Sequence, residues 1–295
     1  MRANPGTHAE NILGATFMMA SVVAFVGNDT LMKTLSGEVP LFQAVLVRGA
    51  LASLLIGGVA MARGEARLAA LSVKDRRTAA LRSLAEVGST VCFLTALFAM
   101  PIANATAIML AAPMLITLLG AVLLGERVGW RRWSAMIVGF LGVLLIVRPG
   151  GDAFNAASLW AVSAVVFVCV RDLSTRRLSP ETPSLLISLM TAVVITAAAG
   201  VVVVVDGWTP MGGTEVTRLA IAAVFVFVGY VFSVKAMRVG DVGFTSPFRY
   251  TILIWALILG WAVFGDAPEP LTLVGAGLVA GAGVYTFLRA GKKLR

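Results

Sequence analysis

Residues 18–40, MMASVVAFVGNDTLMKTLSGEVP, decide the fold of this chain because a close copy of them follows 143 residues later. Shifted by that amount, they lie over residues 161–183, AVSAVVFVCVRDLSTRRLSPETP, with seven identities in 23 ungapped positions. A second match, at a shift of 140, sets the pair Gly125 and Glu126 over Gly265 and Asp266. The sequence therefore predicts two copies of one unit, residues 1–150 and residues 151–295.

The composition around these copies is that of a membrane protein. Of the 295 residues, 59% are hydrophobic and only 13% are charged, and the mean hydropathy of +0.92 is outside the range of soluble proteins. The apolar runs are uninterrupted and close to the roughly 20 residues that a helix needs to cross a bilayer, which predicts an all-α membrane protein. The ten predicted spans are residues 12–33, 40–62, 78–100, 102–124, 131–147, 156–173, 182–205, 215–238, 243–265 and 270–289.

Ten spans in two copies give five spans to each copy. Because five is odd, the second copy is predicted to cross the membrane in the opposite sense to the first. Such inverted repeats are a recurrent architecture of secondary transporters, in which the two copies exchange conformations and open a shared site alternately to either side. The repeat therefore favours a carrier that works by alternating access.

The basic residues predict the orientation of the spans. On the ten-span assignment, eighteen of the 24 Lys and Arg residues fall on one side of the membrane and three on the other. By the positive-inside rule the richer side, which carries both termini, is cytoplasmic, and the protein belongs in the cytoplasmic (inner) membrane. The net charge of +9 then reflects topology, so no nucleic-acid partner is expected.

Two longer stretches resemble a known family. Residues 124–150, LGERVGWRRWSAMIVGFLGVLLIVRPG, and residues 248–278, FRYTILIWALILGWAVFGDAPEPLTLVGAGL, resemble the two EamA repeats of the drug/metabolite transporter superfamily. The resemblance implies ten helices, a central cavity between the repeats, and movement of a small molecule without ATP hydrolysis or a cofactor. Similar bacterial members include exporters of amino acids, aromatic ones among them. A monomer surrounded by membrane lipid is the expected assembly.

Two charged side chains stand nearest to the middle of their spans. Arg48 and Glu86 have opposite charge and comparable depth, and an ionisable group at that depth is a functional hypothesis. A zwitterionic amino acid needs a cation for its carboxylate and an anion for its ammonium, which these two residues could supply. The structural alternatives are that Arg48 and Glu86 pair with each other, or that Glu86 pairs with Arg82 one helical turn away.

Polar residues nearer to the span ends are candidates for gating or for a vestibule. Asn28 and Asp29 lie near the outer end of the first span, and Asp172, the repeat partner of Asp29, lies near the inner end of the sixth. Capping or an ion pair at the membrane boundary is the structural alternative for the two aspartates. Arg249, beside Tyr250, could attract anions at an inner vestibule or could extend to the interface.

Aromatic residues and one proline complete the candidate site. The depths of Phe93, Phe167, Tyr230 and Trp255 suit contact with an apolar substrate group, although packing is the common role of such residues. Pro113, in the middle of the fourth span, is predicted to kink its helix and to shape a cavity wall.

Several classes of function are disfavoured. The only histidine is His8, and no span has His, Cys, Asp and Glu residues at the spacing of metal ligands. Neither a phosphate-binding loop of the Walker type nor a dinucleotide fingerprint is present. The leading hypothesis is export of neutral or aromatic amino acids, and the alternatives are uptake, drug efflux and an intramembrane lipid-modifying enzyme.

Overall fold

The computed structural model describes residues 8–66, 71–115, 118–119, 130–147, 156–175, 177–179, 181–239 and 245–292. These residues form ten α-helices and one 3-10 helix, and no strand occurs among them. In chain order the helices are α1 (His8–Thr34), α2 (Leu41–Ala62), α3 (Val73–Ala99), α4 (Ile102–Met109), α6 (Trp130–Val147), α7 (Ala156–Thr175), α8 (Ser184–Asp206), α9 (Gly213–Arg238), η2 (Ser246–Thr251), α11 (Ile252–Phe264) and α12 (Pro270–Lys292).

Six of the described helices are long and apolar enough to cross a membrane, namely α1, α2, α3, α7, α8 and residues 213–233 of α9. The remaining four predicted spans coincide with shorter apolar helices at residues 102–115, 133–147, 248–264 and 270–285. Large apolar side chains cover the outside of the bundle; Val204, for example, is 86% exposed. An all-helical fold is confirmed for the described residues. The predicted boundary at residues 150 and 151, and the pair Gly125 and Glu126, lie outside them.

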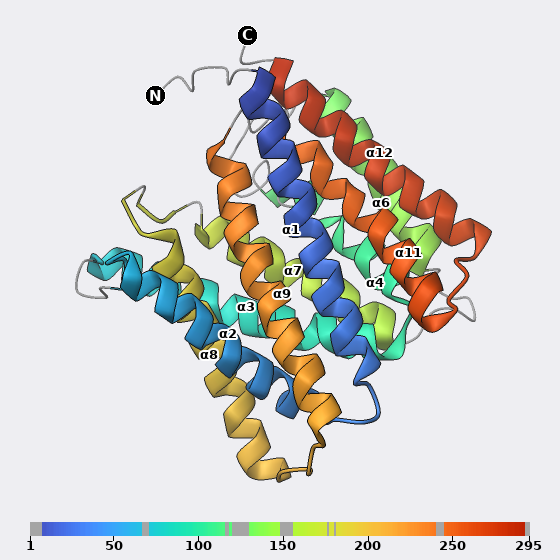
Figure 1. The fold of residues 1–295 in the computed structure, drawn as a ribbon. Helices are drawn as coiled ribbons and strands as arrows, with labels where there is room; N and C mark the ends of the chain where they lie inside the picture. Colours follow the sequence, from blue (N-terminus) through green and yellow to red (C-terminus); the bar gives the residue numbers. More distant parts are fainter. Residues whose placement is uncertain are drawn as a thin grey trace.

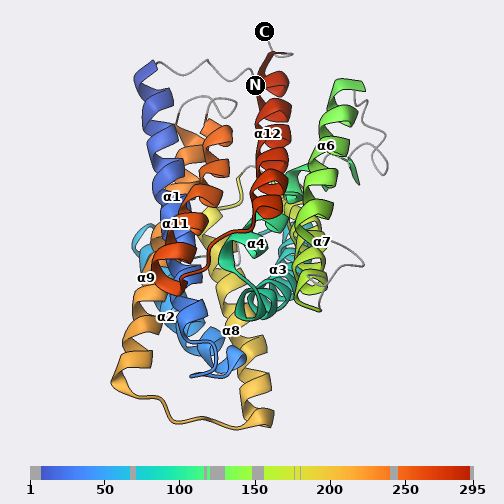
Figure 2. The ribbon, with the colours of Figure 1, turned by 90° about the vertical axis from the view of Figure 1, so that its right-hand side faces the viewer.

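The helices are arranged as pairs that join distant parts of the chain. Helix α1 packs along α9, and α3 packs along α7, while α2 pairs with α8 and α6 pairs with α12. The start of α1 and the end of α12 lie at the same end of the bundle (Figures 1 and 2). For clarity, we call this end of the molecule the terminal end.

Glycines set the close approach of the paired helices. A Cβ on Gly27 of α1 would lie 3.2 Å from the ring of Phe225 on α9, and a Cβ on Gly229 of α9 would lie 2.9 Å from the ring of Phe25 on α1. Each ring therefore occupies the space that the opposite glycine leaves. On the other pair, the ring of Phe167 on α7 covers Gly88 of α3 in the same way.

The fourth predicted span is interrupted close to the expected position. Helix α4 ends at Met109, turn residues follow, and the chain is helical again at residues 112–115. Pro113 has no amide hydrogen, and its ring would meet the carbonyl of Met109 in a continuous helix, which accounts for the break.

A buried glutamine fastens α2 to the segment between α8 and α9. Gln43 is fully buried; its Nε2 donates to the carbonyl of Thr209 at 2.7 Å, and its Oε1 accepts from the amide of Thr209 at 2.9 Å. These two bonds join parts of the chain that are 166 residues apart. The arrangement holds the end of the bundle opposite to the terminal end.

The two bonds between Gln43 and Thr209, which we call the Gln43 clamp, should stabilise the fold measurably. Replacing Gln43 by Met keeps the side-chain length but removes both hydrogen bonds, so the free energy of unfolding should fall by about 1–3 kcal/mol. Ser53→Ala is the matched control on the same helix, because the buried Ser53 hydroxyl has no hydrogen-bond partner within the described part of the chain and its removal should cost nothing. Unfolding of the purified variants in detergent measures both effects, and equal stability of the two variants would contradict the clamp.

Candidate functional site

The interior of the bundle holds an ion triad built on Arg171 of α7. The Arg171 guanidinium contacts Glu86 of α3, with Nη1 3.1 Å from Oε2 and 3.3 Å from Oε1, and its Nε lies 2.7 Å from Oδ1 of Asp172. Glu86 is only 8% exposed. A charge in such a setting is stable only when it is paired, so this triad fixes the facing sides of α3 and α7.

A second group of polar residues joins α1 and α2. Nη1 of Arg48 donates to Oδ1 of Asn28 at 2.9 Å, and Nδ2 of Asn28 donates to Oδ1 of Asp29 at 2.9 Å. The neutral amide therefore stands between the guanidinium and the carboxylate. No described residue forms a direct ion pair with Arg48, although Asp29 attracts its charge across the amide.

Tyr230 of α9 lies between the two groups. Its ring meets that of Phe25 edge-on, with centroids 5.5 Å apart, and its hydroxyl interacts electrostatically with Glu86, Arg171 and Arg48. Arg249 of η2 in turn interacts electrostatically with Asp172 and Arg171. The two groups thus form one assembly, which we call the polar cluster: Asn28, Asp29, Arg48, Glu86, Arg171, Asp172, Tyr230 and Arg249.

The structure brings together most of the predicted polar candidates, but in other pairs than the sequence suggests. Glu86 binds Arg171, so neither predicted alternative, a Glu86 pair with Arg48 or with Arg82, is the observed arrangement. Arg82 instead donates to the hydroxyls of Thr175 and Thr191. Depth along a helix does not determine the direction of a side chain around the helix axis, which explains the error.

Arg171 is the residue that sequence reasoning missed. The ten-span assignment counts Arg171 among the eighteen basic residues of the cytoplasmic side, whereas in the structure it lies inside α7 and reaches the carboxylate of Glu86. The repeat held a usable signal, because the 143-residue shift sets Asn28 over Arg171 just as it sets Asp29 over Asp172. The dipeptides at positions 28–29 and 171–172 both belong to the polar cluster.

The predicted aromatic residues separate into different environments. Phe93 is partly buried and packs on the hydrophobic core, and Phe167 fills the space over Gly88. Trp255 is 37% exposed, and Tyr250 is buried against Gly283. Two aromatic candidates interact electrostatically with charged side chains of the cluster: Tyr230 with Glu86, Arg171 and Arg48, and Tyr250 with Arg249.

Polar contacts also hold the two ends of the bundle. Beyond the cluster on α1, Nζ of Lys33 donates to the carbonyl of Met100 at 2.6 Å, lies 3.5 Å from Oδ2 of Asp266, and lies 5.0 Å from the ring centroid of Phe264. Toward the terminal end, Asp75 accepts hydrogen bonds from the amide and the hydroxyl of Ser179. The contacts of Lys33 with Asp266 and Phe264 and those of Asp75 with Ser179 join the first half of the chain to the second, whereas the bond to Met100 lies within the first half.

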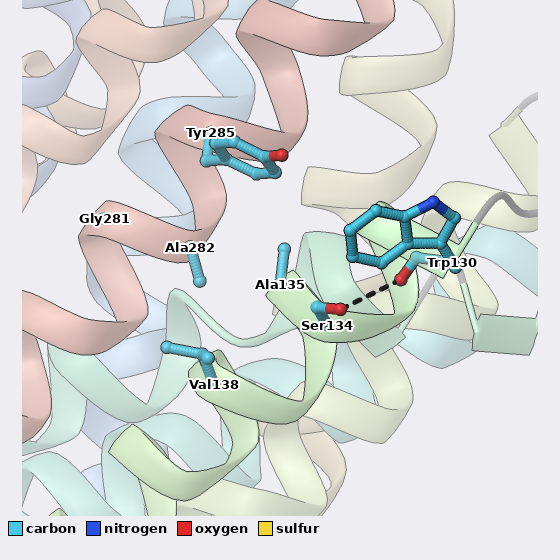
Figure 3. Close-up of a pocket in the computed structure, with 7 residues that line it drawn as sticks. All are labelled: Trp130, Ser134, Ala135, Val138, Gly281, Ala282 and Tyr285. Carbon is cyan, nitrogen blue, oxygen red and sulfur yellow. Dashed lines mark hydrogen bonds between the residues drawn. The ribbon is translucent and has the colours of Figure 1, made fainter.

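Two cavities in the described part of the chain are apolar, and no residue of the polar cluster lines either of them. One of about 290 Å³ lies between α6 and α12, where Trp130, Ser134, Ala135, Val138, Gly281, Ala282 and Tyr285 surround it (Figure 3). A second of about 200 Å³ lies among α2, α3 and α8. No group of His, Cys, Asp and Glu suited to a metal ion occurs among the described residues.

Comparison with protein families gives a match across the chain. The model described as the EamA-like transporter family matches residues 12–148 and 155–288. One solved crystal structure shares the fold, with a TM-score of 0.66 over 93% of this chain and 98% of its own, at 19% identity.

Curated relatives carry different transporter names. A riboflavin transporter of Vibrio cholerae is 30% identical over 197 residues, which are 66% of each chain. An S-adenosylmethionine uptake transporter of Rickettsia felis is 24% identical over 93% of this chain and 92% of its own. The pseudopaline exporter CntI of Pseudomonas aeruginosa is 25% identical over 91% of this chain and 94% of its own.

The second testable prediction concerns the ion triad. Arg171→Leu leaves Glu86 and Asp172 without their shared cation, so the free energy of unfolding should fall by about 3–5 kcal/mol. The double variant Arg171→Gln with Glu86→Gln should lose less, since it removes the opposing charge as well. Arg177→Leu is the control, because Arg177 is exposed just beyond α7. Unfolding midpoints in detergent decide the outcome; additive effects of the two Gln substitutions would count against the pairing.

Proposed function

We propose a substrate class and a transport mode for this chain, which belongs to the EamA-like transporter family of the drug/metabolite transporter superfamily. It is a multi-pass membrane protein that transports a small molecule, and it is not an enzyme. The family predicted from residues 124–150 and 248–278 is thereby confirmed. The aromatic amino-acid exporter subtype stays a prediction.

The proposed function is export of neutral or aromatic amino acids, or of amphipathic metabolites with an amino-acid group, by alternating access. The observation that supports this proposal most directly is the hydrogen bond of Arg48, which is made to the neutral amide of Asn28 and not to a carboxylate. Its remaining N–H donors suit a substrate carboxylate, because a guanidinium presents a planar fork. Glu86 and Asp172 provide negative charge for an ammonium, and Tyr230 and Phe25 provide an aromatic surface between the two groups.

Ten membrane spans in two inverted repeats are the architecture that we propose for this function. The helix pairing supports it, because a shift of 143 residues carries α1 onto α7, α2 onto α8, and α3 onto α9. When each helix is replaced by its repeat counterpart, the α1–α9 pair becomes the α7–α3 pair, and the α2–α8 pair remains the same pair. Each of α2 and α8 also begins directly after a proline, Pro40 and Pro183, which the shift superimposes.

The orientation and the assembly belong to the same proposal. We place the terminal end on the cytoplasmic side of the inner membrane, because eighteen of the 24 basic residues fall there on the ten-span assignment. The apolar outer surface fits direct contact with lipid, and we propose that a single chain forms the complete carrier.

Uptake is the second candidate, and the names of the relatives favour keeping it. The relative from Rickettsia felis is an uptake transporter and the relative from Pseudomonas aeruginosa is an exporter, each at 24% or 25% identity. The substrate of the first, S-adenosylmethionine, is itself an amino-acid derivative. The polar cluster suits either direction of transport.

Counterflow in proteoliposomes tests the proposed function. Vesicles are loaded with unlabelled phenylalanine, threonine or S-adenosylmethionine, and entry of the same labelled compound is followed beside protein-free vesicles. Phenethylamine, which lacks the carboxylate, is the negative compound. Entry of the amino acids without phenethylamine supports the proposal, whereas folded protein that exchanges none of these compounds contradicts the substrate class. Flux in cells that express the protein then separates export from uptake.

The third testable prediction assigns the carboxylate to Arg48. Arg48→Ala should abolish exchange of amino acids and leave the protein monodisperse, because the substitution removes the cation without leaving a buried acid in direct contact. Arg48→Lys should keep part of the activity, since the charge remains and the planar fork does not. Normal exchange by a monodisperse Arg48→Ala variant would contradict the assignment.

A further inference from the structure

We propose that Arg249 is an entry station that captures the carboxylate of the substrate on the terminal side of the membrane, before the carboxylate reaches Arg48. The inference rests on the proposed function and adds to it a second anion site with a defined side. It follows from the charge balance of the polar cluster, from the anchoring of η2, and from the position of η2 along the bundle.

Counting contacts with described residues, Arg249 is the arginine of the polar cluster without a bonded partner. Arg171 takes both Glu86 and Asp172, and Arg48 binds Asn28. Among the residues that the structure describes, none forms a hydrogen bond or an ion pair with the guanidinium of Arg249. Asp172 and Arg171 act on its charge only by longer-range electrostatic interaction. A partly buried guanidinium with unused donors attracts an anion, and its fork suits a carboxylate.

The neighbouring residue, Tyr250, anchors η2 against α12. Tyr250 is 5% exposed, and its hydroxyl occupies the space where a Cβ on Gly283 of α12 would lie. In a 3-10 helix, side chains of successive residues point about 120° apart around the axis. Because Tyr250 is anchored against α12, Arg249 is directed away from that contact, and its charge reaches the Arg171–Asp172 pair of α7.

The position of η2 places the proposed site at the terminal end of the bundle. Gly14, in the first part of α1, packs against the backbone of Val239 and the side chain of Thr245, directly before η2. The segment therefore lies beside the start of α1, at the terminal end of the bundle. Arg48 belongs to α2, which begins at the opposite end, after the end of α1. A carboxylate that enters from the terminal side thus meets Arg249 first and Arg48 later.

Transport measured separately from each face tests the entry station. In membrane vesicles of the two opposite orientations, Arg249→Gln should raise the KM for phenylalanine about tenfold when it is offered from the face that carries the termini, as expected for loss of a charge-assisted bond. The KM from the other face should stay unchanged. Arg177→Gln, which removes an exposed charge near the same end, should leave both values unchanged, and Arg249→Lys should recover part of the loss.

A binding measurement keeps the inference testable without transport. Phenylpropionate, which has a carboxylate and no ammonium, should raise the unfolding temperature of the wild type and of Arg177→Gln, and should raise that of Arg249→Gln by less. An equal rise of KM from both faces, with a lower unfolding temperature without ligand, would reveal a structural role and overturn the proposal. If the wild type exchanges no amino acid, the proposed function fails, and the phenylpropionate shift alone decides whether Arg249 binds anions. A shift that is the same in Arg249→Gln and in the wild type would overturn the entry station.

Discussion

The Arg171 guanidinium, held between the carboxylates of Glu86 and Asp172, is the interaction on which the interior of this bundle depends. Charged groups inside an apolar helix bundle are tolerated only when they neutralise one another. The triad gives both acids of α3 and α7 a cation partner while it keeps one net negative charge. Among the described residues, the cation of α2 has a neutral partner and the cation of η2 has no bonded partner. The arrangement therefore combines a stable centre with two positions of unused positive charge.

The function that we propose depends on this uneven pairing. If every charge were paired, a substrate would have to break an ion pair before binding. In the binding mode that we propose, a carboxylate binds Arg48 without displacing any acid, because the hydrogen bond from Arg48 ends on the amide of Asn28. The triad can keep its own contacts while a substrate binds beside it.

Much of this fold could be predicted from the sequence, because hydrophobic runs, prolines and repeated residues can be recognised along the chain without knowledge of spatial contacts. Apolar runs give the helices, the matched prolines at positions 40 and 183 give two helix starts, and the repeat relates residues 28–29 to residues 171–172. The partners inside the cluster could not be predicted, since depth in a span does not fix the angle around the helix. Arg171 illustrates the limit: its position near a span end suggested a loop residue, yet its long side chain reaches a carboxylate in the middle of α3. The Gln43 clamp gave no sequence signal at all, because a glutamine alone does not identify the loop that it binds.

The reciprocal contacts of phenylalanine and glycine between α1 and α9 restrict how the bundle can deform. Phe25 lies over Gly229, and one turn earlier on the same helix is Phe225, which itself lies over Gly27. A slip of one helical turn that brings Phe225 to the level of Gly229 would press the two rings together, so the contacts oppose sliding in that direction. We therefore expect α1 and α9 to move together as one rigid pair. Conformational change would then occur between helix pairs and not within this one.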